Sequence, residues 1–348
     1  MHEKYMYRCL ELARKGLGNT APNPLVGCVI VYQDRIIGEG YHMYFGGNHA
    51  EVNAIQSIKT PELLKDSTLY VNLEPCSHFG KTPPCTGVIM EAGLKKIIVG
   101  VTDPNSIVSG EGIRQLTDKG IKAGTNILKK ECIHLNRRFF TFHKKKRPYI
   151  VLKWAQTNDG FIDRIRNGHE QGTINWITDE ASRILVHKWR AEEQAILIGS
   201  RTAILDNPRL DTRHWPGKSP LRLVIDRKNT MPDHLHILDG TAETTVFTSN
   251  PKPAGKNLSY VTLDKHADII SVLLTYLYEK DIQSLLVEGG RILLGAFIKK
   301  GIWDEARVMV GNKAFVKGVP APVMPSEPIT QFKFAESTVK IYRHRDSF

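Results

Sequence analysis

The feature that most constrains the fold is a set of metal-ligand residue types spread along the N-terminal part of the chain. His49 and Glu51 are two positions apart, and two Pro-Cys pairs follow, Pro75-Cys76 and Pro84-Cys85. One histidine and two cysteines supply the three protein ligands of a catalytic zinc site, which leaves the fourth position for water. If they share one ion, the fold must bring a predicted helix start at His49 next to a predicted strand end at Cys76.

Strand and helix patterns alternate around these residues. The runs 26–32 and 35–42 predict a hairpin that turns at Gln33-Asp34. The pattern further predicts a helix from His49 to about Ile58, strands over 67–76 and 97–102, a helix between the last two strands, and another helix within 110–124. Strands that alternate with helices indicate a layered α/β domain.

A basic run, "HKKKRP" at 143–148, has the composition of a solvated linker, and the pattern restarts at Tyr149. The second half predicts strands over 149–154, 194–200, 221–226, 244–249 and 284–290, and helices over 179–190, 266–279 and 291–300. We therefore expect two α/β domains, residues 1–144 and 145–348.

Composition excludes several classes of protein. The 348 residues contain 41% hydrophobic and 24% charged residues and no apolar run long enough for a membrane span. The N-terminus lacks a signal-peptide core, and five cysteines are too few and odd in number for a disulfide framework. We expect a cytoplasmic protein without a membrane partner.

The net charge of +12 is compatible with nucleic acid, with phosphorylated ligands or with solubility alone. Aromatic residues do not alternate with the basic ones as they do in platforms that stack bases. Nucleic acid is therefore not the expected partner.

Glu51 has a chemical role if the three ligands bind zinc. It is the acid that remains beside the metal without binding it, and it can move a proton from an activated water to a leaving amine. His-x-Glu followed by Pro-Cys is the pattern of zinc nucleobase deaminases, although their two cysteines are usually three positions apart, whereas Cys76 and Cys85 are nine apart. The alternative, a loop with two unrelated thiols and a solvated histidine, leaves the paired Pro-Cys motifs unexplained.

Three stretches, "APNPLVGCVIV", "HAEVNAI" and "EPCSHFGKTPPC", together resemble the deaminase domain of the bifunctional riboflavin-biosynthesis deaminase/reductase family, in which the long spacing between cysteines is characteristic. The resemblance implies a three-layer fold like that of cytidine deaminase and a phosphoribosylated diaminopyrimidinone substrate. It also implies that Asn23 and His42 border the pyrimidine pocket. Taken alone, they would be a turn asparagine and a partly exposed histidine.

The C-terminal half resembles the reductase domain of the same family in "LKWAQTNDGFI", in the segment 175–213 and in "LLVEGGRILLGAFI". This resemblance implies a fold like that of dihydrofolate reductase and the use of NADPH to reduce a ribose to ribityl. Without it, Glu288-Gly289-Gly290 would be read either as a tight turn or as a place where a phosphate approaches a helix N-terminus.

The resemblance carries over a set of residues. The expected NADPH contacts are Ala155, Trp176, Thr202, Asp206, Gly290, Arg291, Ile292, Leu293, Leu294, Gly295 and Ala296, and the expected substrate contacts are Lys153, Arg190, Leu210, Arg213 and Glu288. The guanidinium groups of Arg190 and Arg213 suit a two-pronged clamp on a phosphate, with surface ion pairs as the alternative. Lys153 supplies charge complementarity near the site of hydride transfer.

The chain departs from the family in three places. Ile174 replaces a small polar residue, Thr157 replaces the serine of a Ser-x-Asp-Gly motif, and Ser106 replaces a proline. Ile174 puts one substrate hydrogen bond in doubt.

Two other functions remain open on the sequence. A nucleic-acid base deaminase is weakly supported by the charge, and a zinc-stabilised binding protein would need a fourth ligand, for which His78 is the nearby residue. The family resemblance also implies a homo-oligomer.

Overall fold

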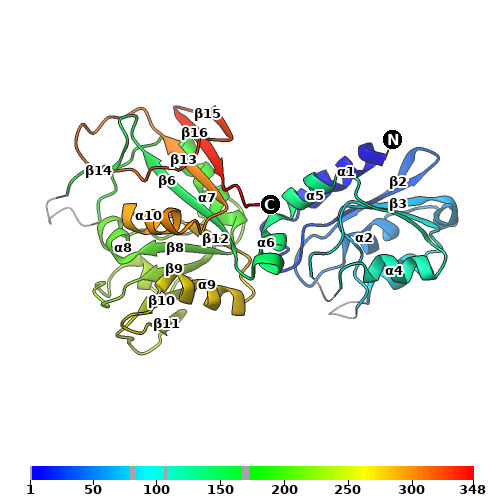
Figure 1. Ribbon diagram of the computed structural model, residues 1–348, viewed down its shortest axis with the longest axis horizontal. Coiled ribbons are helices and arrows are strands. Elements are labelled where there is room, and N and C mark those ends of the chain that lie inside the picture. The colour runs from blue at the N-terminus through cyan, green and yellow to red at the C-terminus, as the bar shows by residue number, and fades with distance from the viewer. Residues whose placement is uncertain (1, 79–82, 106–107, 167–171) are drawn as a thin grey trace. The chain divides into compact units, whose positions relative to one another are not determined.

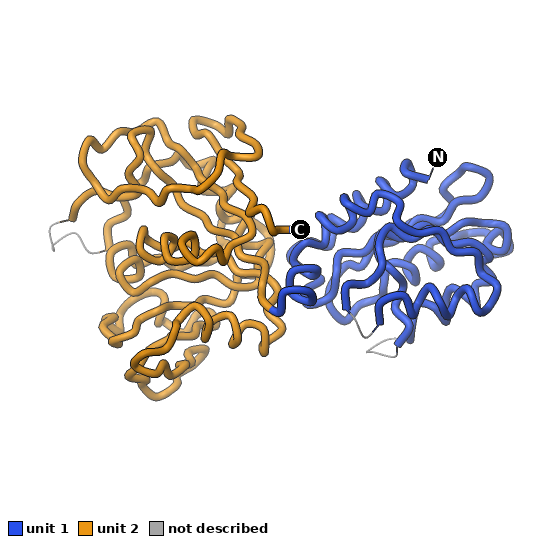
Figure 2. The backbone as a smooth tube through the Cα atoms, viewed as in Figure 1, with its two compact units in different colours: residues 1–146, 348 blue, residues 147–347 orange. Residues whose placement is uncertain are grey.

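The structure is a computed structural model that describes residues 2–78, 83–105, 108–166 and 172–348. It consists of two compact units, residues 1–146 with residue 348, and residues 147–347 (Figure 2). Among the described residues, no helix is both long enough and apolar enough to cross a membrane.

The first unit is built on a five-stranded sheet in the order β2-β1-β3-β4-β5. The strands are β1 (Gly27–Tyr32), β2 (Arg35–Tyr41), β3 (Thr68–Val71), β4 (Lys96–Val99) and β5 (Lys122–Gly124). The predicted hairpin is confirmed, and both turn residues, Gln33 and Asp34, have positive φ. Strand β3 ends before the predicted end at Cys76, because Asn72 turns its side chain onto the backbone of Gly27 and Leu25.

Helices cover both faces of this sheet and form three layers with it (Figure 1). On one face lie α1 (His2–Arg14), α5 (Lys129–Leu135) and α6 (Arg137–Lys145); on the other lie α2 (Ala50–Gln56), α3 (Cys85–Glu91) and α4 (Glu111–Asp118), with a short 3-10 helix, η1 (Pro61–Asp66), between α2 and β3. Alternate residues of β1 face the two layers, as its period of two requires: Val29 and Val31 face α1, and Cys28 and Ile30 face α2. Helix α6 includes His143 to Lys145, so the first half of the expected linker is helical.

The backbone of α2 lies directly against β2. A Cβ atom on Gly40 would lie 2.3 Å from the Ala54 nitrogen and 2.5 Å from the Ala50 oxygen, and one on Gly38 would lie 2.7 Å from the Ala54 oxygen. Only residues without a side chain permit this approach. The glycines therefore set the position of the helix whose first turn carries Glu51.

The second unit contains a nine-stranded sheet in the order β11-β10-β9-β8-β12-β6-β13-β16-β15 and a two-stranded sheet, β14-β7. The strands of the large sheet are β6 (Tyr149–Gln156), β8 (Ala195–Gly199), β9 (Leu221–Ile225), β10 (Thr244–Thr248), β11 (Leu258–Thr262), β12 (Ser284–Val287), β13 (Glu305–Val310), β15 (Thr330–Phe334) and β16 (Ser337–Arg343), and the small sheet pairs β7 (Phe161–Asp163) with β14 (Val319–Pro320). The seven strands from β11 to β13 in this order run parallel, and β16 pairs antiparallel with both β13 and β15.

Helices α9 (Ile269–Glu279) and α10 (Arg291–Lys300) pack on one face of the large sheet. Helices α7 (Glu180–Glu192) and α8 (Ser200–Asp206) and the 3-10 helix η2 (His236–Leu238) pack on the other. Because the central strands are parallel, their carboxyl ends share one edge, and ligands of open α/β sheets bind outside that edge. Ser200 and Glu288 lie just beyond the carboxyl ends of β8 and β12, and Lys153 lies in the second half of β6. Figure 1 shows these strands side by side in the large sheet.

Candidate active sites

The three predicted metal ligands converge in the first unit. His49 is the N-cap residue of α2, Cys76 lies in the loop after β3, and Cys85 begins α3. His49 Nδ1 is 3.2 Å from Cys85 Sγ and 3.5 Å from Cys76 Sγ, and all three ligand atoms lie within 4.8 Å of one another. His78, the nearby residue considered as a fourth ligand, is exposed and does not belong to this group. Residues 79–82, between the two cysteines, lie outside the described residues.

The donor chemistry of this group suits zinc. The Cys85 thiol and the His49 imidazole lower the pKa of Cys76, while the hydrogen bond with Cys76 and burial raise the pKa of Cys85. The backbone N–H of Cys85 also donates to Cys76 Sγ, at 3.3 Å. A thiolate is therefore favoured at Cys76, and an imidazole with two sulfurs is a ligand set that Zn²⁺ prefers.

Glu51 lies on the buried side of α2, with 3% of its surface exposed. Burial raises the pKa of its carboxyl group, and the nearby Cys76 adds to this effect. The carboxyl group interacts with the Cys85 side chain but is not one of the three clustered ligands. A buried carboxyl group next to a metal site, with a raised pKa, has the properties of a general acid or base.

Asn23 and His42 form a pair next to the metal ligands. The Asn48 carbonyl lies 2.9 Å from His42 Nδ1 and can only accept, so Nδ1 carries the proton and donates. His42 Nε2 is then an acceptor for the Asn23 amide, at 3.1 Å. The His42 ring packs edge-on to His49, at 5.3 Å between ring centroids, and burial lowers its pKa. The neutral tautomer of His42 therefore orients Asn23.

Sequence reasoning missed Glu74, which ties the next loop to the metal-ligand segment. Its carboxylate accepts hydrogen bonds from the backbone N–H groups of Asp103 and Gly110, at 3.0 and 2.9 Å, and of Ile113, at 3.2 Å. The only sequence signal was its place in Leu-Glu-Pro-Cys. Ser106, expected in the same loop, lies outside the described residues.

In the second unit, Lys153, Arg190 and Glu288 form a largely buried ionic cluster, with 11 to 12% of each side chain exposed. Arg190 Nε and Nη2 donate to the two carboxylate oxygens of Glu288, each at 2.9 Å, and Lys153 Nζ lies 3.9 Å from Glu288 Oε2. Burial raises the pKa of Glu288, but Arg190 and Lys153 more than offset this and bring it to about 2. Burial lowers the pKa of Lys153 more than Glu288 raises it.

The expected cofactor residues lie along α8 and α10. Thr202 lies on α8 close to Gly290, since a Cβ on Gly290 would be 3.5 Å from Thr202 Oγ1. The rest of the segment, Arg291, Ile292, Leu293, Leu294, Gly295 and Ala296, forms the first turns of α10. The Ile292 side chain is exposed and that of Leu294 is buried in the core. The backbone N–H groups in the first turn of a helix can bind an anion such as a phosphate.

The remaining expected cofactor residues are Trp176, in the segment before α7, Asp206, at the end of α8, and Ala155, on β6. Trp176 is 44% exposed, and Asp206 at the end of α8 pairs with Arg166 at 2.6 Å. Arg166 also donates to the carbonyl oxygens of Thr173 and Leu205, both at 2.8 Å. Arg166, which we did not identify from the sequence, connects α8 to the stretch that carries Ile174 and Trp176. Ala155 lies on β6, two residues beyond Lys153.

The expected substrate residues Leu210 and Arg213 lie on the loop after α8. The Leu210 side chain is only 2% exposed and belongs to the core, so its backbone is the part available to a ligand. Arg213 is half-exposed and pairs with the carboxylate of Asp211, whose carbonyl accepts a hydrogen bond from Arg190 Nη1 at 3.3 Å. Arg190 and Arg213 thus both contact Asp211. The guanidinium group of Arg190 also forms an ion pair with Glu288 through two hydrogen bonds.

Two families match the chain. The cytidine and deoxycytidylate deaminase zinc-binding region matches residues 1–101, and the RibD C-terminal domain matches residues 148–340. The predicted fold class, a cytidine-deaminase-like domain followed by a reductase domain, is confirmed by these matches.

Relatives and solved structures match over nearly the whole length. The riboflavin biosynthesis protein RibD of Bacillus amyloliquefaciens is 38% identical, and the match covers 95% of this chain and 92% of the relative. The protein of the same name from Escherichia coli is 36% identical, and the match covers 89% of this chain and 88% of the relative. A crystal structure of a diaminohydroxyphosphoribosylaminopyrimidine deaminase/5-amino-6-(5-phosphoribosylamino)uracil reductase from Thermotoga maritima has a TM-score of 0.88 and 36% identity, and it covers 99% of this chain and 98% of its own. The chain therefore belongs to the RibD family and is a bifunctional enzyme of riboflavin biosynthesis, with a deaminase domain and a reductase domain.

Proposed function

We propose that the first unit deaminates 2,5-diamino-6-(5-phosphoribosylamino)pyrimidin-4-one and that the second uses NADPH to reduce the ribosyl group of the product to ribityl. The observation that carries the proposal is the convergence of His49, Cys76 and Cys85 beside the buried Glu51. Similarity over nearly the whole chain to the Thermotoga maritima deaminase/reductase supports the substrate assignment.

In the deaminase site, His49, Cys76 and Cys85 would hold zinc, which lowers the pKa of a bound water to about 7. Glu51 then accepts a proton from water and delivers it to the departing amine. Asn23 is fixed by the neutral His42, so its amide N–H₂ faces His42 and its carbonyl oxygen is left for the pyrimidine. These side chains orient the ring so that the amine-bearing carbon meets the activated water.

In the reductase site, bound NADPH would supply the hydride for C1′ of the ring-opened ribosylamine, in which C1′ is doubly bonded to the amine nitrogen. Ring opening breaks the bond between C1′ and the ring oxygen, which needs a proton to become the C4′ hydroxyl group, and the Lys153 ammonium is the donor that the cluster presents. Burial lowers the pKa of Lys153, which makes the proton easier to transfer, while Glu288 and Arg190 fix its position. Ala155, Trp176, Thr202, Asp206 and the α10 segment would hold the cofactor.

The substrate phosphate is assigned to Arg213 rather than to a clamp of two arginines. Arg190 already makes a two-pronged pair with Glu288, whereas Arg213 is half-exposed and pairs only with the neighbouring Asp211 among the contacts of the described residues. A guanidinium group binds a phosphate through two parallel N–H donors, and the net charge of +12 favours the approach of anionic substrates.

The test separates the two half-reactions. Purified wild-type, Glu51→Gln and Lys153→Met proteins are given the diaminopyrimidinone phosphate with NADPH, and ammonia release and NADPH oxidation are measured separately, the latter also with pre-deaminated substrate. We expect Glu51→Gln to slow ammonia release about 10²- to 10⁴-fold with its zinc content unchanged. We expect Lys153→Met to slow only NADPH oxidation. Ammonia release by Glu51→Gln at the wild-type rate would refute the role of Glu51.

A further inference from the structure

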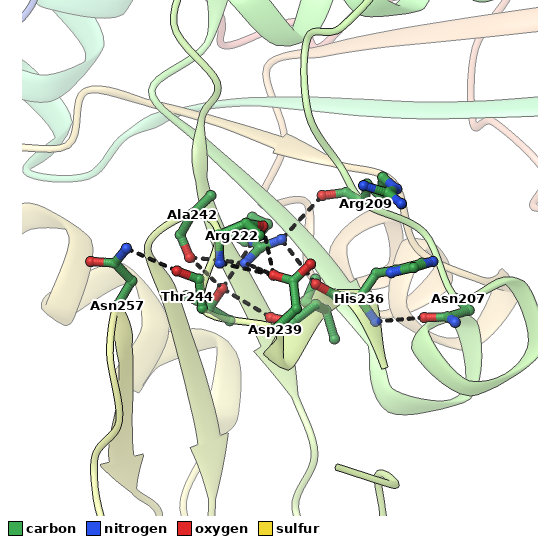
Figure 3. A network of polar contacts seen from close by, with 11 residues as sticks. Asn207, Arg209, Arg222, His236, Asp239, Ala242, Thr244 and Asn257 are labelled. Carbon is green, nitrogen blue, oxygen red and sulfur yellow. Dashed lines mark hydrogen bonds and ion pairs between the residues drawn. The ribbon is translucent and has the colours of Figure 1, made fainter. Parts of the chain in front are cut away.

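Arg222 is a buried arginine in β9, within the otherwise apolar run Leu-Arg-Leu-Val-Ile, and only 1% of its surface is exposed. Its guanidinium group donates mainly to neutral oxygens (Figure 3): the carbonyls of Arg209, His236 and Ala242, at 3.4, 3.1 and 2.8 Å, and Thr244 Oγ1, at 2.9 Å. Its carboxylate partner Asp239 is 3.4 Å away. The five donors of this side chain thus hold backbone segments together.

One of these segments is the loop from Asn207 to Arg213, which is held at several points. Asn207 Oδ1 accepts from the His236 N–H at 2.7 Å, as Figure 3 shows, and the Arg209 carbonyl accepts from Arg222. The Asp211 carbonyl accepts from Arg190. Between these two carbonyls, each bound by a buried arginine, lies Leu210.

Leu210 has a φ of 54°, in the left-handed region that L-residues with a Cβ rarely adopt. Such a conformation persists only where the surroundings impose it. Here the imposing contacts are the two arginine-bound carbonyls and the burial of the Leu210 side chain in the core that also contains Leu235 and Ile237. Without Arg222, the Arg209 carbonyl loses its donor, and the loop loses one of the contacts that impose this conformation on Leu210.

We propose that Arg222 is a positioning residue of the reductase site: it fixes the Asn207–Arg213 loop so that Arg213 is presented to the phosphate of the substrate. The inference rests on the proposed role of Arg213. Arg222 acts through the loop, and its own side chain is buried away from any ligand. The proposal predicts an effect on the pyrimidine substrate that is larger than the effect on NADPH.

The test compares Arg222→Met with Thr244→Val, which removes the acceptor of Arg222 Nε but leaves the contact with the Arg209 carbonyl. Steady-state NADPH oxidation is measured as a function of the concentration of each substrate, and backbone hydrogen exchange is followed in residues 209–213. For Arg222→Met we expect the KM for the pyrimidine to rise on the order of tenfold, faster exchange in the loop and a KM for NADPH within about twofold of wild type. Thr244→Val should keep both KM values within about twofold, and ammonia release, which belongs to the other unit, should be unchanged in both variants.

Arg222→Lys, which keeps one donor group and the charge, provides the second variant and should give an intermediate KM. Equal changes of both KM values, an unchanged pyrimidine KM, or failure of both Arg222 variants to fold would overturn the proposal, since Arg222 would then be a structural residue alone. Arg213→Ala tests the underlying assignment separately: if its pyrimidine KM is unchanged, the role of Arg213 is wrong, whatever Arg222 does.

Discussion

Replacing Glu288 by glutamine removes the single negative charge that two buried cations share. Arg190 loses its two-pronged carboxylate partner, because the amide N–H₂ of glutamine would face a guanidinium N–H, and Lys153 loses its counterion. The pKa of Glu288 lies at about 2, against an ordinary value of 4.5, and at 1.36 kcal/mol per pKa unit the cluster stabilises the fold by ~3 kcal/mol. Removing one partner of a buried ion pair typically costs about 3 to 5 kcal/mol, so the two estimates agree.

The measurement is urea unfolding of wild type and Glu288→Gln at pH 7, followed by tryptophan fluorescence. All five tryptophans, Trp154, Trp176, Trp189, Trp215 and Trp303, lie in the second unit, so this signal reports on that unit alone. We expect a loss of ~3 kcal/mol, which corresponds to a melting temperature lower by about 6 to 12 °C. Glu279→Gln, at an exposed position that ends α9, is the matched control and should stay within about 0.5 kcal/mol of wild type.

The pH dependence of this difference supplies a second check. Because the pKa of Glu288 is depressed in the folded protein, its contribution is complete above pH 4.5 and is lost as the pH falls toward about 2. The stability gap between wild type and Glu288→Gln should therefore narrow over that range. A gap below about 1 kcal/mol at pH 7, or one that does not change on acidification, would show that the cluster does not stabilise the fold as argued.

Two further predictions concern the two half-reactions. Treatment with a zinc chelator should abolish ammonia release, while NADPH oxidation measured with pre-deaminated substrate should be unchanged. Metal analysis of Cys85→Ser should show loss of bound zinc. Full deamination by zinc-free protein would contradict the ligand assignment. If Lys153 donates the proton, the rate of NADPH oxidation should fall as the pH rises through the pKa of Lys153. Because burial lowers that pKa, the fall should begin below the ordinary lysine value of 10.5. A rate that stays constant up to pH 10.5 would show that Lys153 does not donate the proton.

The sequence predicted the elements whose residues carry a local pattern. The hairpin at Gln33-Asp34, the start of α2 next to His49 and the helix over 291–300 are all confirmed. Strands β11, β13 and β15 were missed. In β13 alternate charged residues, Glu305 and Arg307, are buried, so the segment does not have the apolar run that identifies a strand covered on both faces.

The site residues also differ in whether a local sequence pattern identifies them. The convergence of His49, Cys76 and Cys85 could be predicted because zinc chemistry restricts residue types and their spacing is short enough to form a motif. The pairing of Arg190 with Glu288 spans 98 positions. Two of the contacts of Arg166 and most of those of Arg222 are to backbone carbonyls, which any residue type supplies. Side chains that bind backbone far along the chain leave no residue-type signal in one sequence.

The glycine pair in β2 limits how the deaminase can be redesigned. A methyl group at Gly40 would meet backbone atoms of α2 and not the flexible end of a side chain, so the helix itself would have to shift outward. Such a shift would carry His49 and Glu51 away from the sulfurs of Cys76 and Cys85 at once. Engineering for a different pyrimidine should therefore leave this strand–helix contact untouched.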